Sequence, residues 1–437
     1  MLSIEDNERI SRVGPGTPMG QLMRQYWMPA MLSSELPNPD SDPVRVMLLG
    51  ERLVAFRDTN GQVGLLRNAC PHRGASLFLG RNEECGIRCV YHGWKFAADG
   101  SCVDIPNEPV QQGFKERIRA ISYPVVERGG VVWAYMGPRD TPPPLPDFEG
   151  NAEGGTARAV MRECNWLQAL EGDIDTSHFS FLHLGSAKPE DYPDGSFTRT
   201  TLVDRAPRYK VLDSPAGAMY AAYRPFEPGR VYWRVANFAF PFYTQPGPGT
   251  LGVKVNVRCW VPMDDEHTMF YMMTPSGGGN QANFARRAAA GAGAAAGSNL
   301  LPNGTGWYER FRLQENEGND YFIDREQQRS GGEFTGIKGI HTQDQAITES
   351  MGSLVAREDE HLGSSDVMII RVRNRLLGAV AALEKEGTVP PGVEDPAVYR
   401  ARSGGVILDE GVDWLEATEE LRDANVTVPD VDRTHEP

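Results

Sequence analysis

Two short segments of the chain each offer one cysteine and one histidine as metal ligands. The first reads Cys70-Pro-His72-Arg-Gly-Ala, and the second, separated from His72 by sixteen residues, reads Cys89-Val-Tyr-His92-Gly-Trp. Two thiolates and two imidazoles suit a [2Fe-2S] cluster in which both cysteines bind one iron and both histidines bind the other. The alternative is a structural zinc site, because zinc takes the same ligands in a tetrahedral arrangement.

A second set of candidate ligands lies in Asp175-Thr-Ser-His178-Phe-Ser-Phe-Leu-His183. Residues 165–184 carry a helical pattern of apolar side chains. Residues five apart lie about 140° apart around a regular helix, so we expect a π-type widening or a helix end between the two histidines. Asp175, three residues before His178, lies on the same face. The alternative is a helix with two hydrogen-bonded histidines and surface acids.

Two histidines and one carboxylate can hold Fe(II) while leaving positions open for dioxygen and substrate. The carboxylate could come from Asp344, in His341-Thr-Gln-Asp344-Gln-Ala-Ile-Thr-Glu349. An aspartate near the start of a helix usually serves the cap and the dipole instead. Glu349, Asp320 and Asp324 therefore remain competitors on the basis of the residues alone.

The first cysteine and histidine pair follows a series of strand-like segments. Alternating apolar residues predict strands at 44–49, 53–57 and 63–66, with Asn60-Gly61 as a turn, and a later strand at 131–136. A short helix is expected from Thr17-Pro18 to Trp27, with Thr17 as the N-cap. A small β domain at 41–146, preceded by an N-terminal helix and arm at 1–40, would carry both pairs on hairpin tips.

The proline-rich run at 142–146 and the Gly/Glu-rich residues up to 155 mark a domain boundary, so 147–437 form a second domain. Strand patterns at 219–223, 231–240, 253–260 and 268–273 predict an antiparallel sheet, and a helix is expected at 366–386. The sheet is rich in aromatic residues, with arginines 224, 230 and 234 among them. These side chains could form a pocket for an aromatic acid, although for any single residue a sheet with one buried face is the favoured explanation.

Composition excludes several functions. The 437 residues carry a net charge of -15, whereas nucleic-acid binding needs a basic face. No run of about 18 apolar residues predicts a membrane span, and the acidic N-terminus is unlike a secretory signal. The other four cysteines, 85, 102, 164 and 259, form no disulfide pattern, so we expect them to be buried in a cytoplasmic protein. The Ala/Gly-rich run at 288–297, within 286–306, predicts a lid or a disordered insert.

The motifs resemble those of the Rieske non-haem iron oxygenases. That family has cluster loops C-x-H-R-G and C-x-x-H-G-W, followed by D-x-x-H-x4-H, and a late helix with Q/E-D-x-x-x-x-E. The runs 13–20, 80–85 and 343–352 are most similar to the branch of aromatic ring-hydroxylating enzymes with a catalytic subunit alone. That branch includes phthalate and phenoxybenzoate dioxygenases and aryl ether O-demethylases.

The resemblance implies a role for each candidate residue. The [2Fe-2S] cluster would be bound by Cys70, His72, Cys89 and His92, and a mononuclear Fe(II) by His178, His183 and Asp344. Asp175 would accept hydrogen bonds from His178 and from His92 of the partner subunit, in the way that carboxylates commonly orient metal-bound imidazoles. Glu171 is left without a role, because some relatives carry asparagine there.

The resemblance also implies an α+β fold. A small all-β Rieske domain would precede a larger domain in which an antiparallel sheet grips a helix (helix-grip). The protein would be a homotrimer or homohexamer that uses O2 and electrons from a separate NAD(P)H-dependent reductase or ferredoxin. Its substrate would be an aromatic compound, carboxylated or an aryl ether, and the reaction ring hydroxylation or O-demethylation. The alternatives are a Rieske electron carrier, which needs only the first domain, and a zinc-stapled binding protein.

Overall fold

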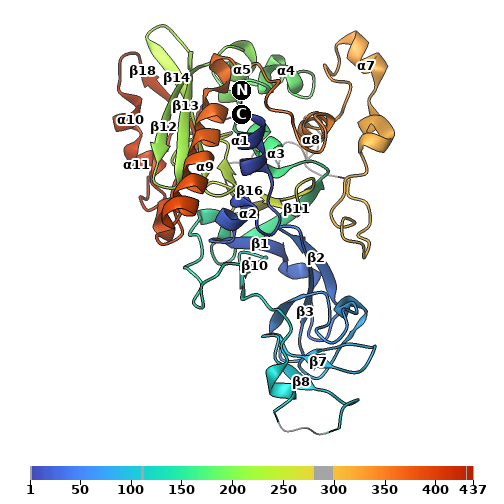
Figure 1. The fold of residues 1–437 in the computed structure, drawn as a ribbon. Helices are drawn as coiled ribbons and strands as arrows, with labels where there is room; N and C mark the ends of the chain where they lie inside the picture. Colours follow the sequence, from blue (N-terminus) through green and yellow to red (C-terminus); the bar gives the residue numbers. More distant parts are fainter. Residues whose placement is uncertain (1, 110–112, 280–298, 430, 437) are drawn as a thin grey trace.

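The computed structural model describes residues 2–109, 113–279, 299–429 and 431–436. The Ala/Gly-rich run at 288–297, where a lid or insert is expected, lies outside the described residues. A small unit of short strands forms the lower end of the molecule, and a large sheet with its helices lies above it (Figure 1). The fold is therefore the expected α+β arrangement.

The small unit contains two antiparallel sheets. One has the order β2-β3-β4 and the other the order β5-β6-β7-β8. The predicted strands at 44–49, 53–57 and 63–66 are confirmed, with Gly61 at φ +84° in the turn before the third. The bounds are β2 Val44–Leu48, β3 Glu51–Arg57, β4 Val63–Arg67, β5 Arg81–Asn82, β6 Ile87–Arg88, β7 Lys95–Phe96 and β8 Cys102–Asp104.

A third small sheet links this unit to the N-terminus. β1 (Trp27–Leu32) pairs with β10 (Val131–Tyr135), which pairs with β9 (Val125–Arg128). Two helices precede it, α1 (Ile4–Ser11) and α2 (Pro18–Met23). Thr17 caps α2 as expected, but this helix ends at Met23 because Trp27 already begins a strand. The domain limits at 40 and 146 stay a prediction, since β1 from the N-terminal arm shares a sheet with β10.

The large sheet is antiparallel and has eight strands in the order β11-β17-β16-β15-β14-β13-β12, with β18 pairing with β14. Four of these strands were predicted, although the one expected from residue 253 begins at Val257. The other four, β11, β12, β15 and β18, were not predicted, and β15 has only three residues. The bounds are β11 Thr156–Arg162, β12 Arg208–Ser214, β13 Gly217–Pro225, β14 Arg230–Ala239, β15 Tyr243–Gln245, β16 Val257–Pro262, β17 Thr268–Thr274 and β18 Gly404–Asp409.

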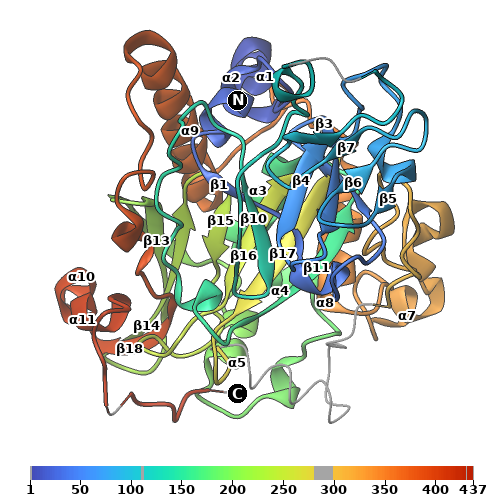
Figure 2. The same cartoon turned by 90° about the horizontal axis from the view of Figure 1, so that it is seen from below.

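Helices cover this sheet. The predicted helix α9 (Val367–Glu386) ends at Gly387, whose φ of +66° suits glycine, and it lies against β12, β13, α1 and α2. α9 lies at one flank of the molecule, and α7 (Arg325–Ser330) and α8 (Ile340–Ser350) lie at the other (Figure 1, Figure 2). The remaining α-helices are α3 Trp166–Ile174, α4 Phe179–Leu182, α5 Phe197–Val203, α10 Trp414–Ala417 and α11 Glu419–Arg422.

Short 3-10 turns connect these elements. They are Ser33–Glu35, Leu77–Leu79, Lys115–Arg117, Glu149–Asn151, Pro189–Asp191, Glu317–Phe322, Ser364–Asp366 and Pro396–Tyr399. Within the described ranges, no helix is long and apolar enough to cross a bilayer.

The main hydrophobic core is continuous from α1 and β1 through the large sheet to α9. A smaller core, which includes Val54, Phe56 and Phe96, surrounds the two cysteines of the expected cluster loops. Cys102, Cys164 and Cys259 are buried, as expected. Cys85 is not: it is half-exposed in a left-handed turn (φ +60°), where its sulfur accepts a hydrogen bond from Asn60.

Candidate functional site

The two cluster loops share one backbone conformation. In each, the cysteine N–H donates to the carbonyl five residues later at 2.8 Å, and the residue four positions later donates to the cysteine carbonyl at 2.9 Å. That fourth residue is Gly74 in one loop and Gly93 in the other, with φ of +76° and +81°. Because such φ values favour glycine, the Gly in each motif allows the turn that places Cys70 and Cys89 at equivalent positions.

The four side chains of these loops converge. Cys70 and Cys89 are buried, and the rings of His72 and His92 lie 4.4 Å apart between centroids. The Nδ1 atom of His92 is buried without a hydrogen-bond partner among the described residues, as expected of an atom that binds metal. Trp94 stacks on His72 at 4.4 Å. Two inner thiols and two outer imidazoles fit a [2Fe-2S] cluster.

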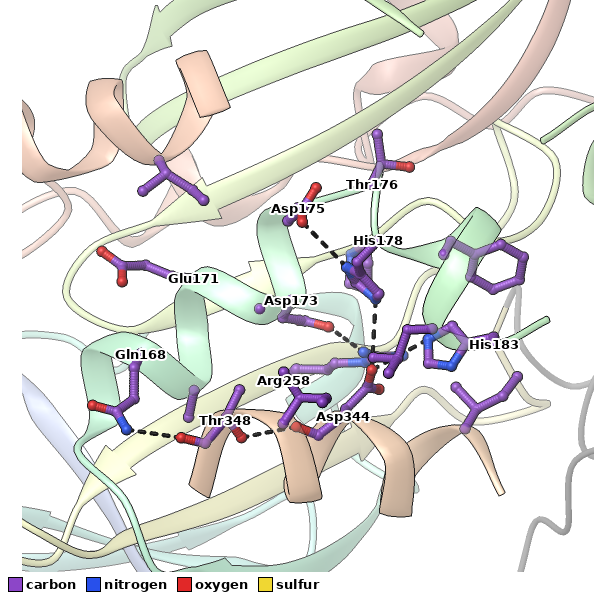
Figure 3. A pocket seen from close by; sticks show the side chains of 18 of the residues that line it. Gln168, Glu171, Asp173, Asp175, Thr176, His178, His183, Arg258, Asp344 and Thr348 are labelled. Carbon is purple, nitrogen blue, oxygen red and sulfur yellow. Dashed lines mark hydrogen bonds and ion pairs between the residues drawn. The ribbon is translucent and has the colours of Figure 1, made fainter. Parts of the chain in front are cut away.

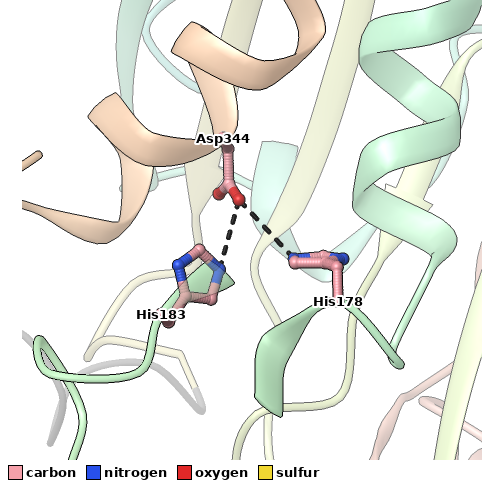
Figure 4. Close-up of side chains that lie close together, drawn as sticks. All are labelled: His178, His183 and Asp344. Atoms are coloured by element: carbon pink, nitrogen blue, oxygen red, sulfur yellow. Dashed lines mark ion pairs between the residues drawn. The ribbon is translucent and has the colours of Figure 1, made fainter. Parts of the chain in front are cut away.

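His178, His183 and Asp344 come together at a second site (Figure 4). One atom of Asp344, Oδ1, lies 3.5 Å from Nε2 of His178 and 3.2 Å from Nε2 of His183. One donor atom from each of the three residues lies within 4.8 Å of the others. Burial alone would raise the pKa of Asp344, but the facing histidines, His183 foremost, lower it well below its usual range. An ionised carboxylate between two imidazoles is a suitable site for a divalent metal.

The helix predicted over 165–184 is interrupted. α3 ends at Ile174, Asp175 is extended with φ -85° and ψ 113°, and a single helical turn, α4, follows. His178 and His183 flank that turn as its two cap residues. This interruption precedes both histidines, and no π-type widening occurs. The expected helix end between them is confirmed, because α4 ends at Leu182. Flanking a single turn allows both imidazoles to face Asp344.

In each imidazole, Nδ1, the nitrogen that does not face Asp344, has its own partner. Asp175 Oδ2 lies 3.6 Å from Nδ1 of His178, while its Oδ1 accepts hydrogen bonds from the N–H and hydroxyl of Ser177 at 2.7 and 2.8 Å. Gln343 Oε1 lies 2.7 Å from Nδ1 of His183. The role of Gln343 was missed at the sequence level, although it immediately precedes Asp344 in the motif.

Comparison with known proteins identifies the family of both parts of the chain. Residues 26–115 match the Rieske [2Fe-2S] domain family, and residues 134–435 match the family described as LigXa C-terminal domain like. The chain is 45% identical to the oxygenase subunit of 3-chlorobenzoate-3,4-dioxygenase from Comamonas testosteroni, over 96% of this chain and 98% of that protein. It is 37% identical to the phthalate 4,5-dioxygenase oxygenase subunit of Pseudomonas putida, over 95% and 94%.

The chain belongs to the Rieske non-haem iron oxygenases. Its fold resembles that of dicamba monooxygenase bound to dicamba, with a TM-score of 0.55 and 17% identity over 83% of this chain and 99% of that one. The expected branch and cofactors, a Rieske [2Fe-2S] cluster and mononuclear iron, are confirmed. The electron-carrier and zinc-stapled alternatives are not supported, because the second family match covers the whole catalytic region of this Rieske oxygenase.

The other carboxylates considered for the iron site have different partners in this Rieske oxygenase. Glu349 accepts hydrogen bonds from the Tyr321 hydroxyl at 2.6 Å and from Gln345 at 2.7 Å. Asp324 caps the N-terminus of α7, and Asp320 is exposed. Of the four candidates, Asp344 is the one that the structure brings to the histidines.

Glu171, left without a role at the sequence level, belongs to a buried ion-pair network. Its carboxylate binds Arg357 at 2.9 Å and Arg373 at 2.6 Å, and Arg373 also binds Glu360. Burial would raise the pKa of Glu171, but the two arginines lower it below its usual value. The network joins α3 to α9 at the cavity that His178, His183 and Asp344 also line, so Glu171 positions these helices.

A cavity of about 290 Å³ lies beside the triad (Figure 3). Most of its lining is apolar or aromatic, including Phe179, Phe197, Tyr232, Trp260 and Phe270. Of the side chains singled out in the aromatic sheet, Tyr232 and Arg234 line the cavity, whereas Arg224 and Arg230 do not. The sheet contributes to the pocket through several strands: β14 with Tyr232 and Arg234, β16 with Arg258 and Trp260, and β17 with Phe270.

The arginines around this cavity differ in their partners. Arg258 forms an ion pair with Asp173, Arg373 binds Glu171, and Arg162 donates to the Thr348 hydroxyl at 3.1 Å. Arg234 has neither a hydrogen bond nor an ion pair with any described residue, and its Nε atom is buried. Its guanidinium lies 6.0 Å from the ring centre of Phe179. Among the described residues, Arg234 is thus an arginine of the cavity lining without a direct ion-pair partner, and it lies next to aromatic side chains.

Proposed function

We propose that this Rieske oxygenase oxidises a carboxylated aromatic compound with O2. The observation that carries the proposal is the position of Arg234 in an apolar cavity that also contains the iron site. A cation removed from water without a partner is costly, and an arginine pairs well with a carboxylate through two parallel hydrogen bonds. The relatives reported above are named for 3-chlorobenzoate and phthalate, both aromatic carboxylates.

The ligand roles follow from the two convergent sites. Cys70 and Cys89 would hold one iron of the cluster, and His72 and His92 the other. Burial raises the pKa of the Cys70 thiol to about 11, so binding of the cluster must displace its proton. The mononuclear iron would be held by Nε2 of His178, Nε2 of His183 and the carboxylate of Asp344. When bound, that iron supplies open positions at which O2 can be activated.

Asp175 would connect the two centres across a subunit boundary. Within one chain, β7, which directly follows the second cluster loop, lies at the lower end of the molecule, whereas α4 lies near the top (Figure 1). The side chains at the tip of the second loop are exposed, Val90 at 59% and Tyr91 at 54%. A head-to-tail homotrimer, or a hexamer of two trimers, would bring His92 of the partner subunit to Asp175, whose Oδ2 atom faces His178.

Electrons would come from a separate NAD(P)H-dependent reductase or a ferredoxin, because the sequence lacks a Gly-rich nucleotide motif between strand and helix. The cytoplasmic location expected from the cysteine pattern stays a prediction.

A substrate panel with labelled O2 tests the proposal. The protein, with a reductase, is offered substituted benzoates, methoxybenzoates and the matching neutral amides. We expect conversion of the acids and little conversion of the amides. A diol with two labelled oxygens identifies ring dioxygenation, whereas formaldehyde and a phenol identify O-demethylation. Equal conversion of acids and amides would contradict the proposed role of the carboxylate.

A further inference from the structure

Gln343 is a buried glutamine whose side chain touches the imidazole of His183. Its exposed fraction is 0%, and its Oε1 atom lies 2.7 Å from Nδ1 of His183. It lies in α8, one residue before Asp344. The same helix therefore presents two consecutive side chains to the iron site, one to each nitrogen of a single imidazole.

The surroundings determine which end of the Gln343 amide faces the histidine. Its other end is surrounded by oxygen atoms: Ile337 O at 2.7 Å, Ser186 Oγ at 3.1 Å, Thr335 Oγ1 at 3.2 Å and Glu333 Oε2 at 3.4 Å. A backbone carbonyl accepts and never donates. A flipped amide would place its own oxygen against the Ile337 carbonyl and leave two acceptors in contact. The NH2 group must therefore face Ile337, and the oxygen must face His183.

The orientation of the amide sets the tautomer of His183. Because Oε1 of Gln343 can only accept, Nδ1 of His183 must carry the proton and donate it. In the neutral imidazole the lone pair then lies on Nε2, the atom that faces Asp344 at 3.2 Å. A metal needs that lone pair. His178 differs, because its Nδ1 faces the carboxylate of Asp175 at 3.6 Å.

We propose that Gln343 is a positioning residue that holds His183 in the tautomer and orientation required to bind iron. The proposal rests on the assignment of His183 as an iron ligand under the proposed function. Partners of this kind typically change metal affinity by about 10- to 100-fold when they are removed. Because Gln343 and Asp344 are adjacent in α8, a displacement of this helix would disturb two of the three ligands together.

The test measures Fe(II) binding by the full-length protein after chelation has removed the mononuclear iron and left the cluster intact. Ferrous ions are titrated without oxygen, and the visible spectrum verifies the cluster in each variant. We expect Gln343→Leu to weaken Fe(II) binding by about 10- to 100-fold. Gln345→Leu is the matched control: it removes a buried glutamine from the same helix, where the amide contacts Met161 and Glu349 instead of a histidine. We expect it to bind Fe(II) normally.

Gln343→Glu separates hydrogen bonding from packing. It keeps an acceptor oxygen for His183, and its second oxygen, in the protonated acid, can donate to the Ile337 carbonyl in place of the amide NH2 group. We expect it to bind Fe(II) more tightly than Gln343→Leu. A role in packing alone predicts the opposite order, because leucine is tolerated in a buried site better than a carboxylate. Should the leucine variant not fold, Gln343→Met provides the same comparison with a flexible apolar side chain.

The outcomes distinguish this inference from the function on which it rests. If Gln343→Leu binds Fe(II) like the unaltered protein while His183→Ala does not, the inference is overturned and the iron site stands. If His183→Ala also binds Fe(II) normally, the assignment of the iron site itself is wrong.

Discussion

Oδ1 of Asp344 lies 3.2 Å from Nε2 of His183, although one residue comes from α8 and the other from the end of α4. This contact completes a ligand set that two well-separated segments supply. We expect His183→Ala to lose the mononuclear iron and to lower turnover by about a thousandfold or more, which corresponds to about 4 kcal/mol. The red-brown absorption of the cluster should persist, because its ligands lie in other loops. Iron analysis, visible spectra and product formation measure the three effects, and undiminished turnover would contradict the site.

Arg234 should determine the affinity for an acidic substrate. A hydrogen bond to a charged group contributes about 1.5–3 kcal/mol, so Arg234→Gln should raise KM for an aromatic acid by about 10- to 150-fold. KM for a neutral analogue should change little. Arg230→Gln is the control, since Arg230 lies on the same strand, outside the cavity lining, and pairs with Glu227. Steady-state kinetics with both substrates measures the two KM values. An equal rise in KM for the acid and for the neutral analogue would contradict the proposal.

Asp175 should matter for electron transfer more than for metal binding. Asp175→Asn keeps the shape of the side chain and leaves the three iron ligands in place, so both metal centres should be retained. Reoxidation of the reduced cluster in a single turnover should slow at least about tenfold, because the asparagine loses the charge that faces His178. Stopped-flow absorption follows this step. A variant that reoxidises its cluster at the normal rate would show that Asp175 does not connect the centres.

Asp264 and His267 should make stability depend on pH. Burial opposes the charge on Asp264, but hydrogen bonds from His267 and Tyr308 lower its pKa to about 2 from the ordinary 3.8, and Asp264 in turn raises the pKa of His267. The contribution of Asp264 to folding stability is present above pH 3.8 and is lost as the pH falls toward 2. The contribution of His267 to folding stability is present below pH 6.5 and is lost as the pH rises through its raised pKa. Asp264→Asn should therefore lower stability most between about pH 4 and 6.5, by about 1 kcal/mol after allowance for solvent.

Urea unfolding of Asp264→Asn and of the unaltered protein at several pH values measures this difference. It should shrink at both ends of the range. A difference that stays constant down to pH 3 would show that the Asp264 carboxylate is not ionised in the way described.

Glu171 should be needed for stability. Glu171→Leu leaves Arg357, which has an exposed fraction of 0%, without its carboxylate partner. Loss of one member of a buried ion pair typically costs about 3–5 kcal/mol. Arg371→Gln provides the comparison, because it breaks a surface pair with Asp213 on the same helix, α9, and should cost less than about 1 kcal/mol. Thermal denaturation of both variants tests whether Glu171→Leu loses more stability than Arg371→Gln. Equal losses of stability would contradict the structural role of Glu171.

The sequence alone was sufficient for the cluster loops, the two histidines, the three strands β2, β3 and β4, and four of the eight strands of the large sheet. Cluster ligands lie within a few residues of one another, and the alternation of apolar side chains is a local property, so both can be recognised along the chain. The Gly at the fourth position after each cysteine is equally local, because the turn that requires it spans only those residues.

Tertiary structure decided the rest. Asp344, Glu349, Asp320 and Asp324 are chemically alike, and only the fold shows which carboxylate faces the histidines and which are taken by other partners. The break after Ile174, the unpaired charge of Arg234, the pairing of Glu171 and the contact between Gln343 and His183 likewise depend on segments distant in the sequence. A local pattern indicates which side chains can bind or pair, whereas the burial and partners that determine their use arise when α3, α4, α8 and β14 meet.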